Sequence, residues 1–162
     1  MTDERTEEVA KRVFLVVVDE SEELHLALRF ASRRAQRTGG RVALLQVMEP
    51  SDFSHWMAVE KVMEEEQRSE AEERLRMLSS RVMEWSGEMP VFYIRSGNRR
   101  DELFKLLEEE PSISVLVLGS ATQPGGPGPL ISALTGKFYD RLHIPLTIVP
   151  GSLTEEEVDA LT

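Results

Sequence analysis

The sequence contains no cysteine, which excludes structural disulfides and thiolate metal sites. It also lacks an apolar run of the ~18 residues that a membrane-spanning helix needs. The first residues, 1–12, are polar and acidic and have no apolar stretch typical of a signal peptide, so we expect a soluble, cytoplasmic protein. The three histidines, at positions 25, 55 and 143, are scattered without ligand-like spacing, and no metal site is predicted.

Positive charge is outnumbered by negative charge. Lysine and arginine total 19 against 29 aspartate and glutamate residues, and the formal net charge is −10. Such a balance opposes phosphate backbones and anionic lipid surfaces, so neither nucleic acid nor a membrane is an expected partner. A small anionic ligand stays compatible with the sequence, because backbone N–H groups at a helix start can hold phosphate locally. The length of 162 residues suits one domain.

Short apolar runs alternate with amphipathic stretches along the chain. The runs predicted as strands are 13–18, 42–47, 89–94, 113–118 and 145–149, and the helical patterns cover about 21–38, 56–86, 98–110 and 130–142. Strict alternation predicts an α/β fold: a single-domain, doubly wound, five-stranded parallel sheet with helices on both faces. In a Rossmann-like sheet of this type the expected strand order is 3-2-1-4-5. The domain is expected at 12–150, between a disordered acidic tail at 1–11 and an acidic tail at 151–162 with one helical turn after Thr154.

Several local features predict where helices begin and end. Ser21 is expected to cap the first helix, and Gly39 to end it. Asn98 is expected to cap the third helix, with Asp101 at its third position. The middle of the long second helix, 64–70, has no apolar residue, so we expect it to be exposed and the helix to bend or break there.

Ligands of such sheets bind beyond the carboxyl ends of the strands, at the point where the strand order reverses. The loops after the first and fourth strands therefore hold the candidate site residues. Asp19, after the first strand, could accept hydrogen bonds from a nucleotide, or it could only help Ser21 to cap the helix. After the fourth strand, 119–129 is a Gly-rich loop that could hold phosphates or could be a mobile linker, because its prolines remove N–H donors.

Three stretches of the sequence resemble universal stress proteins. The first is Phe-Leu-Val-Val-Val-Asp at 14–19 with the helix that follows, and the second is Val-Ala-Leu-Leu-Gln-Val at 42–47. The third runs from Gly97 through Val-Leu-Val-Leu-Gly-Ser at 115–120 to Ile-Pro-Leu-Thr-Ile-Val at 144–149. The resemblance covers about 12–150, and its ordered set of pieces, rather than any single piece, is specific.

The resemblance implies a nucleotide site. Members of the family that bind ATP carry Gly, two residues, Gly, nine residues, Gly and then Ser or Thr. Counted from Gly119, the later positions hold Thr122, Ser132 and Ala133, so only the first glycine remains. Asp19 and Val42 match family positions that contact adenosine, which leaves the adenosine side intact and the phosphate side altered. The implied nucleotide-binding residues are Asp19, Val42, Gly119, Ser120, Thr122 and Ser132.

Two functions follow from this resemblance. In the first, the protein is a nucleotide-responsive stress protein that binds ATP or another adenine nucleotide, with or without Mg²⁺, and forms a homodimer through the last strand, 145–149. No general base or arginine finger is identifiable, so it is not expected to be an enzyme beyond very slow ATP hydrolysis. In the second, the altered glycines abolish nucleotide binding, and the protein acts through protein partners.

Overall fold

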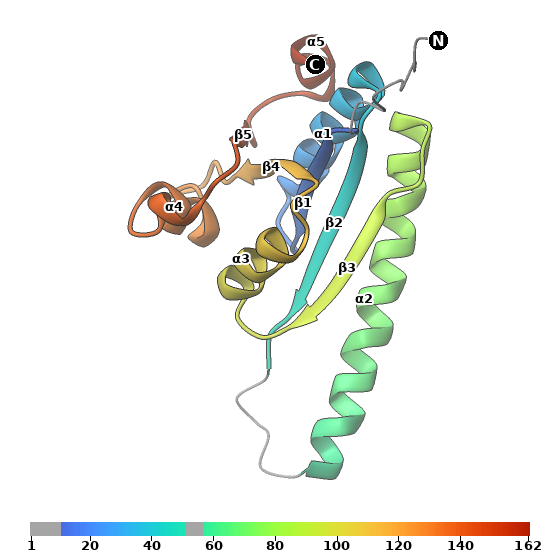
Figure 1. Ribbon diagram of the computed structural model, residues 1–162, viewed down its shortest axis with the longest axis vertical. Helices are drawn as coiled ribbons and strands as arrows, with labels where there is room; N and C mark the ends of the chain where they lie inside the picture. Colours follow the sequence, from blue (N-terminus) through green and yellow to red (C-terminus); the bar gives the residue numbers. More distant parts are fainter. Residues whose placement is uncertain (1–10, 51–56) are drawn as a thin grey trace, which may run out of the picture.

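The sheet has five parallel strands in the order β3-β2-β1-β4-β5, which confirms the predicted architecture (Figure 1). The computed structural model describes residues 11–50 and 57–162. The strands are β1 (Val13–Val18), β2 (Arg41–Met48), β3 (Val91–Ser96), β4 (Ile113–Ser120) and β5 (Leu146–Pro150). The strand order reverses between β1 and β4, which places the expected ligand site at the carboxyl ends of those two strands.

Helices cover both faces of the sheet, as predicted. The helices are α1 (Leu24–Thr38), α2 (Met57–Ser86), α3 (Arg99–Glu109), α4 (Pro129–Thr135) and α5 (Glu155–Leu161), with a short 3₁₀ turn at Tyr139–Arg141. Side chains of α1, α2 and α5 pack on one face, and side chains of α3 and α4 pack on the other. Figure 1 shows that α2 begins beyond the carboxyl ends of β2 and β3 and runs back along them.

The central strand β1 is buried on both faces because its apolar residues point alternately to each side. Phe14, Val16 and Val18 join the core under α1 and α2, whereas Leu15 and Val17 join the core under α3 and α4. Each such buried side chain contributes roughly 1.5–3 kcal/mol relative to an exposed one. An unbroken apolar run is therefore what a central parallel strand requires.

Three helix ends were predicted from particular residues, and the structure confirms two of these predictions and contradicts the third. Gly39 ends α1 with φ 68°, a left-handed conformation that suits glycine. The side chain of Asn98 caps α3 by accepting a hydrogen bond from the backbone N–H of Asp101, as predicted. The prediction that Ser21 caps α1 is wrong: the helix starts after Glu23 without a side-chain cap.

Three further boundaries differ from the prediction. The helix α2 has no break at 64–70, where its residues lie mostly exposed as expected. The strand β4 continues through Gly119 and Ser120, which pair with Val149 and Pro150 of β5. The last amphipathic stretch is not one helix, because α4 ends before Gly136 and a 3₁₀ turn follows.

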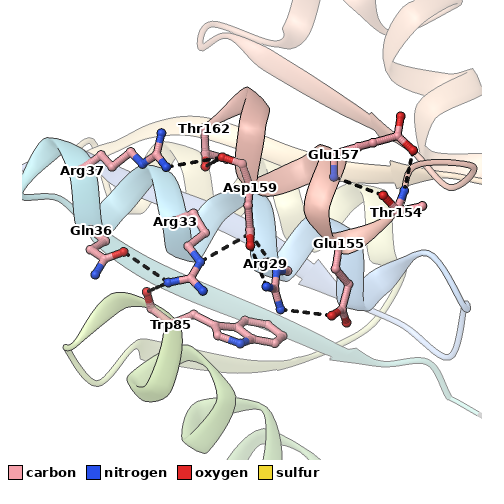
Figure 2. A network of polar contacts seen from close by, with 10 residues as sticks. All are labelled: Arg29, Arg33, Gln36, Arg37, Trp85, Thr154, Glu155, Glu157, Asp159 and Thr162. Carbon is pink, nitrogen blue, oxygen red and sulfur yellow. Dashed lines mark hydrogen bonds and ion pairs between the residues drawn. The ribbon is translucent and has the colours of Figure 1, made fainter.

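The acidic residues after 150 form a helix instead of one turn. Thr154 and Glu157 make a reciprocal capping box that begins α5. Val158 is buried in the core, and Asp159 contacts Arg29 of α1, as Figure 2 shows. Of the predicted N-terminal tail, residues 1–10 lie outside the described residues, as does Trp56 at the predicted start of the long helix.

No helix in the described parts of the chain combines the length and the apolar character that crossing a membrane would require.

Candidate functional site: a cleft at the carboxyl edge of the sheet

Three adjoining cavities open at the carboxyl edge of the sheet. The β2 cavity, of about 510 Å³, lies between the ends of β1 and β2 and the helix α2. The β4 cavity, of about 440 Å³, lies between the β1–α1 loop and the loop after β4. The α3 cavity, of about 170 Å³, separates the start of α3 from α4. Asp19 lines the first two cavities and Arg99 lines all three, so these residues mark a continuous cleft.

Asp19 directly follows β1 and has one oxygen engaged. Its Oδ1 atom accepts hydrogen bonds from the backbone N–H of Ser21, at 2.9 Å, and from the hydroxyl of Ser21, at 2.6 Å. Among the described residues nothing hydrogen-bonds to its Oδ2 atom. These contacts fix the orientation of the carboxylate and leave an acceptor at the boundary between the β2 and β4 cavities. Such an acceptor can bind hydroxyl or amino groups of a ligand.

The β2 cavity has a buried polar group in its floor. Gln46 is only 7% exposed, and its Oε1 atom has no hydrogen-bond partner within the described part of the chain. It lies on the face of β2 that packs under α2, and Gln67, Ala71 and Arg74 of α2 line the same cavity. An amide oxygen buried without a partner is costly, which makes it a natural acceptor for a ligand's N–H group. The sequence carried a signal for it, since Gln46 is the only polar residue inside the run 42–47.

Gly119 shapes the β4 cavity by allowing two backbones to approach. A Cβ atom at this position would lie 2.7 Å from both the Cβ atom and the carbonyl oxygen of Glu23, just before α1. Any side chain there would push the start of α1 away from the end of β4. The loop that follows closes on itself through a 3.0 Å hydrogen bond from the N–H of Ala121 to the carbonyl oxygen of Pro127.

Two arginines at the start of α3 line the α3 cavity. Arg100 lies 4.1 Å from the ring centre of Phe138 and pairs with Asp101 at 3.4 Å. The backbone N–H of Arg99 donates to Glu49 at 3.4 Å. The Nε atoms of both arginines are buried without a hydrogen-bond partner among the described residues. Sequence reasoning did not identify these residues, although the Arg-Arg pair directly follows the cap Asn98 in a chain with an excess of negative charge.

The cleft brings together only part of the predicted site. Asp19 and Gly119 both line the β4 cavity. Val42 does not reach the cleft: it is 1% exposed, pairs with Phe14 near the start of β2, and belongs to the core. On β2 the residues at the cavity are instead Gln46 and Val47, at the opposite end of the strand.

Three of the predicted phosphate residues do not line the cleft. Ser120 pairs with Pro150 in the sheet and lines none of the three cavities. Thr122 and Ser132 are exposed and line none of them either. Ala133, which occupies the position expected for Ser or Thr, does line the α3 cavity beside the two arginines.

Carboxylates surround the β2 cavity without forming a metal cluster. Asp19, Glu20, Glu49 and Glu70 line it, and Glu20 is paired with Arg74 at 3.0 Å. Across the described ranges, 11–50 and 57–162, no group of three or more His, Asp or Glu residues could hold a metal ion.

Comparison with known proteins gives a consistent picture. A family model described as the universal stress protein family matches residues 11–150. The universal stress protein UspA from Lactobacillus plantarum has a similar structure, with a TM-score of 0.70, 21% identity, and coverage of 85% of this chain and 97% of that one. No curated protein matches the sequence.

Two similar structures contain nucleotides. One is the universal stress protein from Archaeoglobus fulgidus in complex with dAMP, with a TM-score of 0.59, 17% identity, and coverage of 86% of this chain and 98% of that one. The other is a universal stress protein in complex with cAMP, with a TM-score of 0.61, 17% identity, and coverage of 88% and 99%. At these identities the likeness establishes the shared fold.

Proposed function

This chain belongs to the universal stress protein family, and on that premise we propose that it binds an adenine nucleotide in the cleft at the carboxyl edge of its sheet. The observation that carries the proposal is the placement of Asp19. Its carboxylate is oriented by Ser21 and faces two cavities of nucleoside size at the reversal of strand order. A carboxylate after a central strand is well suited to accept hydrogen bonds from ribose hydroxyls.

The two nucleotide complexes of similar fold support the choice of ligand. The proteins concerned bind dAMP and cAMP, both of which contain adenine. Gln46 gives a reason from this chain itself. Its unpartnered Oε1 atom in the floor of the β2 cavity could accept a hydrogen bond from the exocyclic amino group of adenine. Guanine presents a carbonyl oxygen at the corresponding position, so the Gln46 amide would have to turn its Nε2 group toward the base instead of its oxygen.

The role that we propose is binding, with at most very slow hydrolysis of ATP. Mg²⁺, where present, would arrive with the phosphates, because this ion is usually held by one or two carboxylates together with substrate phosphates. Glu49 is the carboxylate whose position suits that task, because it lines both the β2 cavity and the α3 cavity.

The first test is the thermal midpoint of the purified protein with and without millimolar ATP, AMP and Mg²⁺. A ligand that binds only the folded state raises this midpoint in a saturable way. We expect a rise with adenine nucleotides and its loss in Asp19→Asn. The matched control is Asp140→Asn, which removes an exposed carboxylate from the 3₁₀ turn and should leave the ligand-dependent rise unchanged.

Absence of any shift would favour a second function, in which the protein binds no nucleotide and acts through protein partners. The observation behind this alternative is that Thr122 and Ser132, at two of the family's glycine positions, are exposed and lie outside the cleft. A shift that survives unchanged in Asp19→Asn would instead place the nucleotide elsewhere on the protein.

We also propose that the protein forms a homodimer through β5. Within the described strands β5 pairs only with β4, so its outer edge is open to a further strand. Ile148 on this strand is 39% exposed, so a partner strand at this edge would cover an apolar side chain. Sedimentation should give a dimer for the unsubstituted protein and a monomer for Ile148→Lys. Phe92→Lys is the matched control, because Phe92 is 47% exposed on the other edge strand, β3. A monomer in all three would contradict the proposal.

A further inference from the structure

We propose that Arg99 and Arg100 bind the phosphate groups of the nucleotide, in place of the glycine loop that performs this task in ATP-binding members of the family. This inference rests on the function proposed above and concerns the same cleft. It assigns the phosphates to the start of α3 and the α3 cavity, rather than to the loop at 121–128.

Arg99 has the position and the free donors that the task requires. It is the residue that lines all three cavities, so its side chain lies where the nucleoside part and the phosphate part of the cleft meet. Its Nε atom is buried without a partner, and its guanidinium forms no ion pair with a described carboxylate. A guanidinium in a cleft without a counter-ion has unpaired charge and unused N–H donors, and an anionic ligand would supply the missing partner.

Among the described residues, no carboxylate that shares a cavity with Arg99 forms an ion pair with its guanidinium. Glu20 is paired with Arg74, and Asp19 accepts two hydrogen bonds from Ser21 through its Oδ1 atom. Glu49 accepts a hydrogen bond from the backbone N–H of Arg99, not from its guanidinium. Glu70 is exposed on α2. The positive charge at the start of α3 is therefore available to a ligand.

Arg100 is held beside Arg99 by two contacts. Its guanidinium lies over the Phe138 ring, 4.1 Å from the ring centre, which brings the side chain toward the segment after α4. Asp101 contacts one of its terminal nitrogens at 3.4 Å, which leaves the other N–H donors free. A planar guanidinium can give two parallel hydrogen bonds to a phosphate, and stacking on an aromatic ring keeps that plane fixed.

The position of Ala133 links the two arginines to the change in the glycine motif. Ala133 lines the α3 cavity with both of them, at the place where the family's motif has Ser or Thr. The chain has thus lost a hydroxyl donor at the wall where it presents two guanidinium groups. Thr122 and Ser132, the other altered positions, are exposed outside the cleft. Charge-assisted bonds from arginine are stronger than those from neutral N–H groups, so the exchange can preserve phosphate binding.

The test measures binding of adenosine, AMP and ATP by titration calorimetry to the unsubstituted protein and to the double variant Arg99→Gln, Arg100→Gln. We expect unchanged adenosine affinity and a loss of about tenfold to a hundredfold in ATP affinity, since hydrogen bonds to charged groups contribute about 1.5–3 kcal/mol and each 1.4 kcal/mol is tenfold. The ATP affinity of the unsubstituted protein should also fall more steeply with added salt than that of the variant.

Arg76→Gln is the matched control. Arg76 lies on α2 with its side chain 73% exposed, and the substitution removes one positive charge remote from the three cavities. It should leave ATP affinity within about twofold, as expected for a screened surface charge. A second variant, Arg99→Lys with Arg100→Lys, keeps the charges and removes the planar forks, and it should bind ATP more weakly than the unsubstituted protein and more tightly than the glutamine variant.

The possible outcomes separate this inference from the function on which it rests. If the unsubstituted protein bound none of the three ligands, both proposals would be wrong. If the double variant bound ATP as tightly as the unsubstituted protein, only the role of the arginines would be overturned. Equal losses for adenosine and ATP would also overturn it, because the arginines would then support the cleft as a whole. Should the glutamine variant fail to fold, the lysine variant gives the same comparison.

Discussion

Arg29 on α1 and Asp159 on α5 form a two-bond ion pair that attaches the last helix to the domain (Figure 2). The Nε atom of Arg29 donates to Oδ1 at 2.8 Å, and a terminal nitrogen donates to Oδ2 at 2.7 Å. The same guanidinium lies 5.3 Å from the ring centre of Trp85 at the end of α2. The hydrogen bond from Arg29 lowers the pKa of Asp159, and burial opposes this shift. One arginine therefore connects α1, α2 and α5.

The ion pair predicts an acid-dependent stability. Because the folded state lowers the pKa of Asp159 below its ordinary value of 3.8, the stabilisation is fully present above that value. It is lost as the pH falls through the lower pKa of the folded state. Asp159→Asn should reduce the free energy of unfolding by about 1 kcal/mol at neutral pH and by progressively less as the pH falls below 3.8. Urea unfolding across this range measures both.

Glu155→Gln is the control for this prediction. Glu155 also contacts Arg29, at 3.3 Å, but its side chain is 50% exposed. Its substitution should change stability by less than about 0.5 kcal/mol. Equal losses in the free energy of unfolding for the two substitutions would show that the two-bond geometry of Asp159 adds no stability beyond that of a single contact.

The sequence predicted the fold well because apolar runs report burial directly. The run 13–18 is β1 to the residue, and the alternation of strands and helices predicted the parallel sheet covered on both faces. Helix boundaries that depend on contacts between distant parts of the chain were harder to predict from the sequence. Ser21 resembles a helix cap in sequence, yet it bonds to Asp19, and the acidic segment 155–161 resembles a tail, yet Val158 is buried. Local residue types could not show which neighbour each of these would meet.

Only part of the candidate site could be predicted from the sequence. Asp19 and Gly119 follow from the general position of ligands in such sheets, and both line the cleft. Val42 was placed at the wrong end of its strand, because a short apolar run gives no marker of which residue reaches the edge. Arg99 was not predicted because its place in the cleft depends on three cavities meeting, which is a property of the assembled fold.

The buried Gln46 side chain leads us to expect a trade-off between the stability of the ligand-free protein and its selectivity for adenine nucleotides. Replacing it with methionine preserves the volume of the side chain and removes the unpartnered buried oxygen. Gln46→Met should therefore raise the free energy of unfolding of the ligand-free protein by about 1 kcal/mol, and it should reduce the preference for ATP over GTP by about tenfold. Denaturant unfolding and competition titration measure the two effects. A less stable variant would show that Gln46 has a partner in the protein.

Gly119 predicts a steric effect on the cleft. In Gly119→Ala the new Cβ atom would meet Glu23, so the start of α1 must shift. We expect a loss of about 1–3 kcal/mol in the free energy of unfolding, as is typical of overpacking, together with weaker nucleotide binding. Ala121→Ser is a suitable control because it also adds one atom at the β4 cavity but starts from a residue that already has a Cβ. If Gly119→Ala were as stable as the unsubstituted protein, the close approach to Glu23 would not matter.

The altered glycine motif leads to a prediction that compares two of its positions, 122 and 133. Ala133 lines the α3 cavity beside Arg99 and Arg100, whereas Thr122 is exposed and lines none of the three cavities. Ala133→Ser adds a hydroxyl donor where we place the phosphates and should tighten ATP binding by about tenfold, with adenosine binding unchanged. Thr122→Gly restores a family glycine but should leave ATP affinity within about twofold, because Thr122 lines none of the three cavities. A larger gain from Thr122→Gly than from Ala133→Ser would mean that the phosphates follow the loop at 121–128, as in ATP-binding members of the family, and that the arginines of α3 serve another purpose.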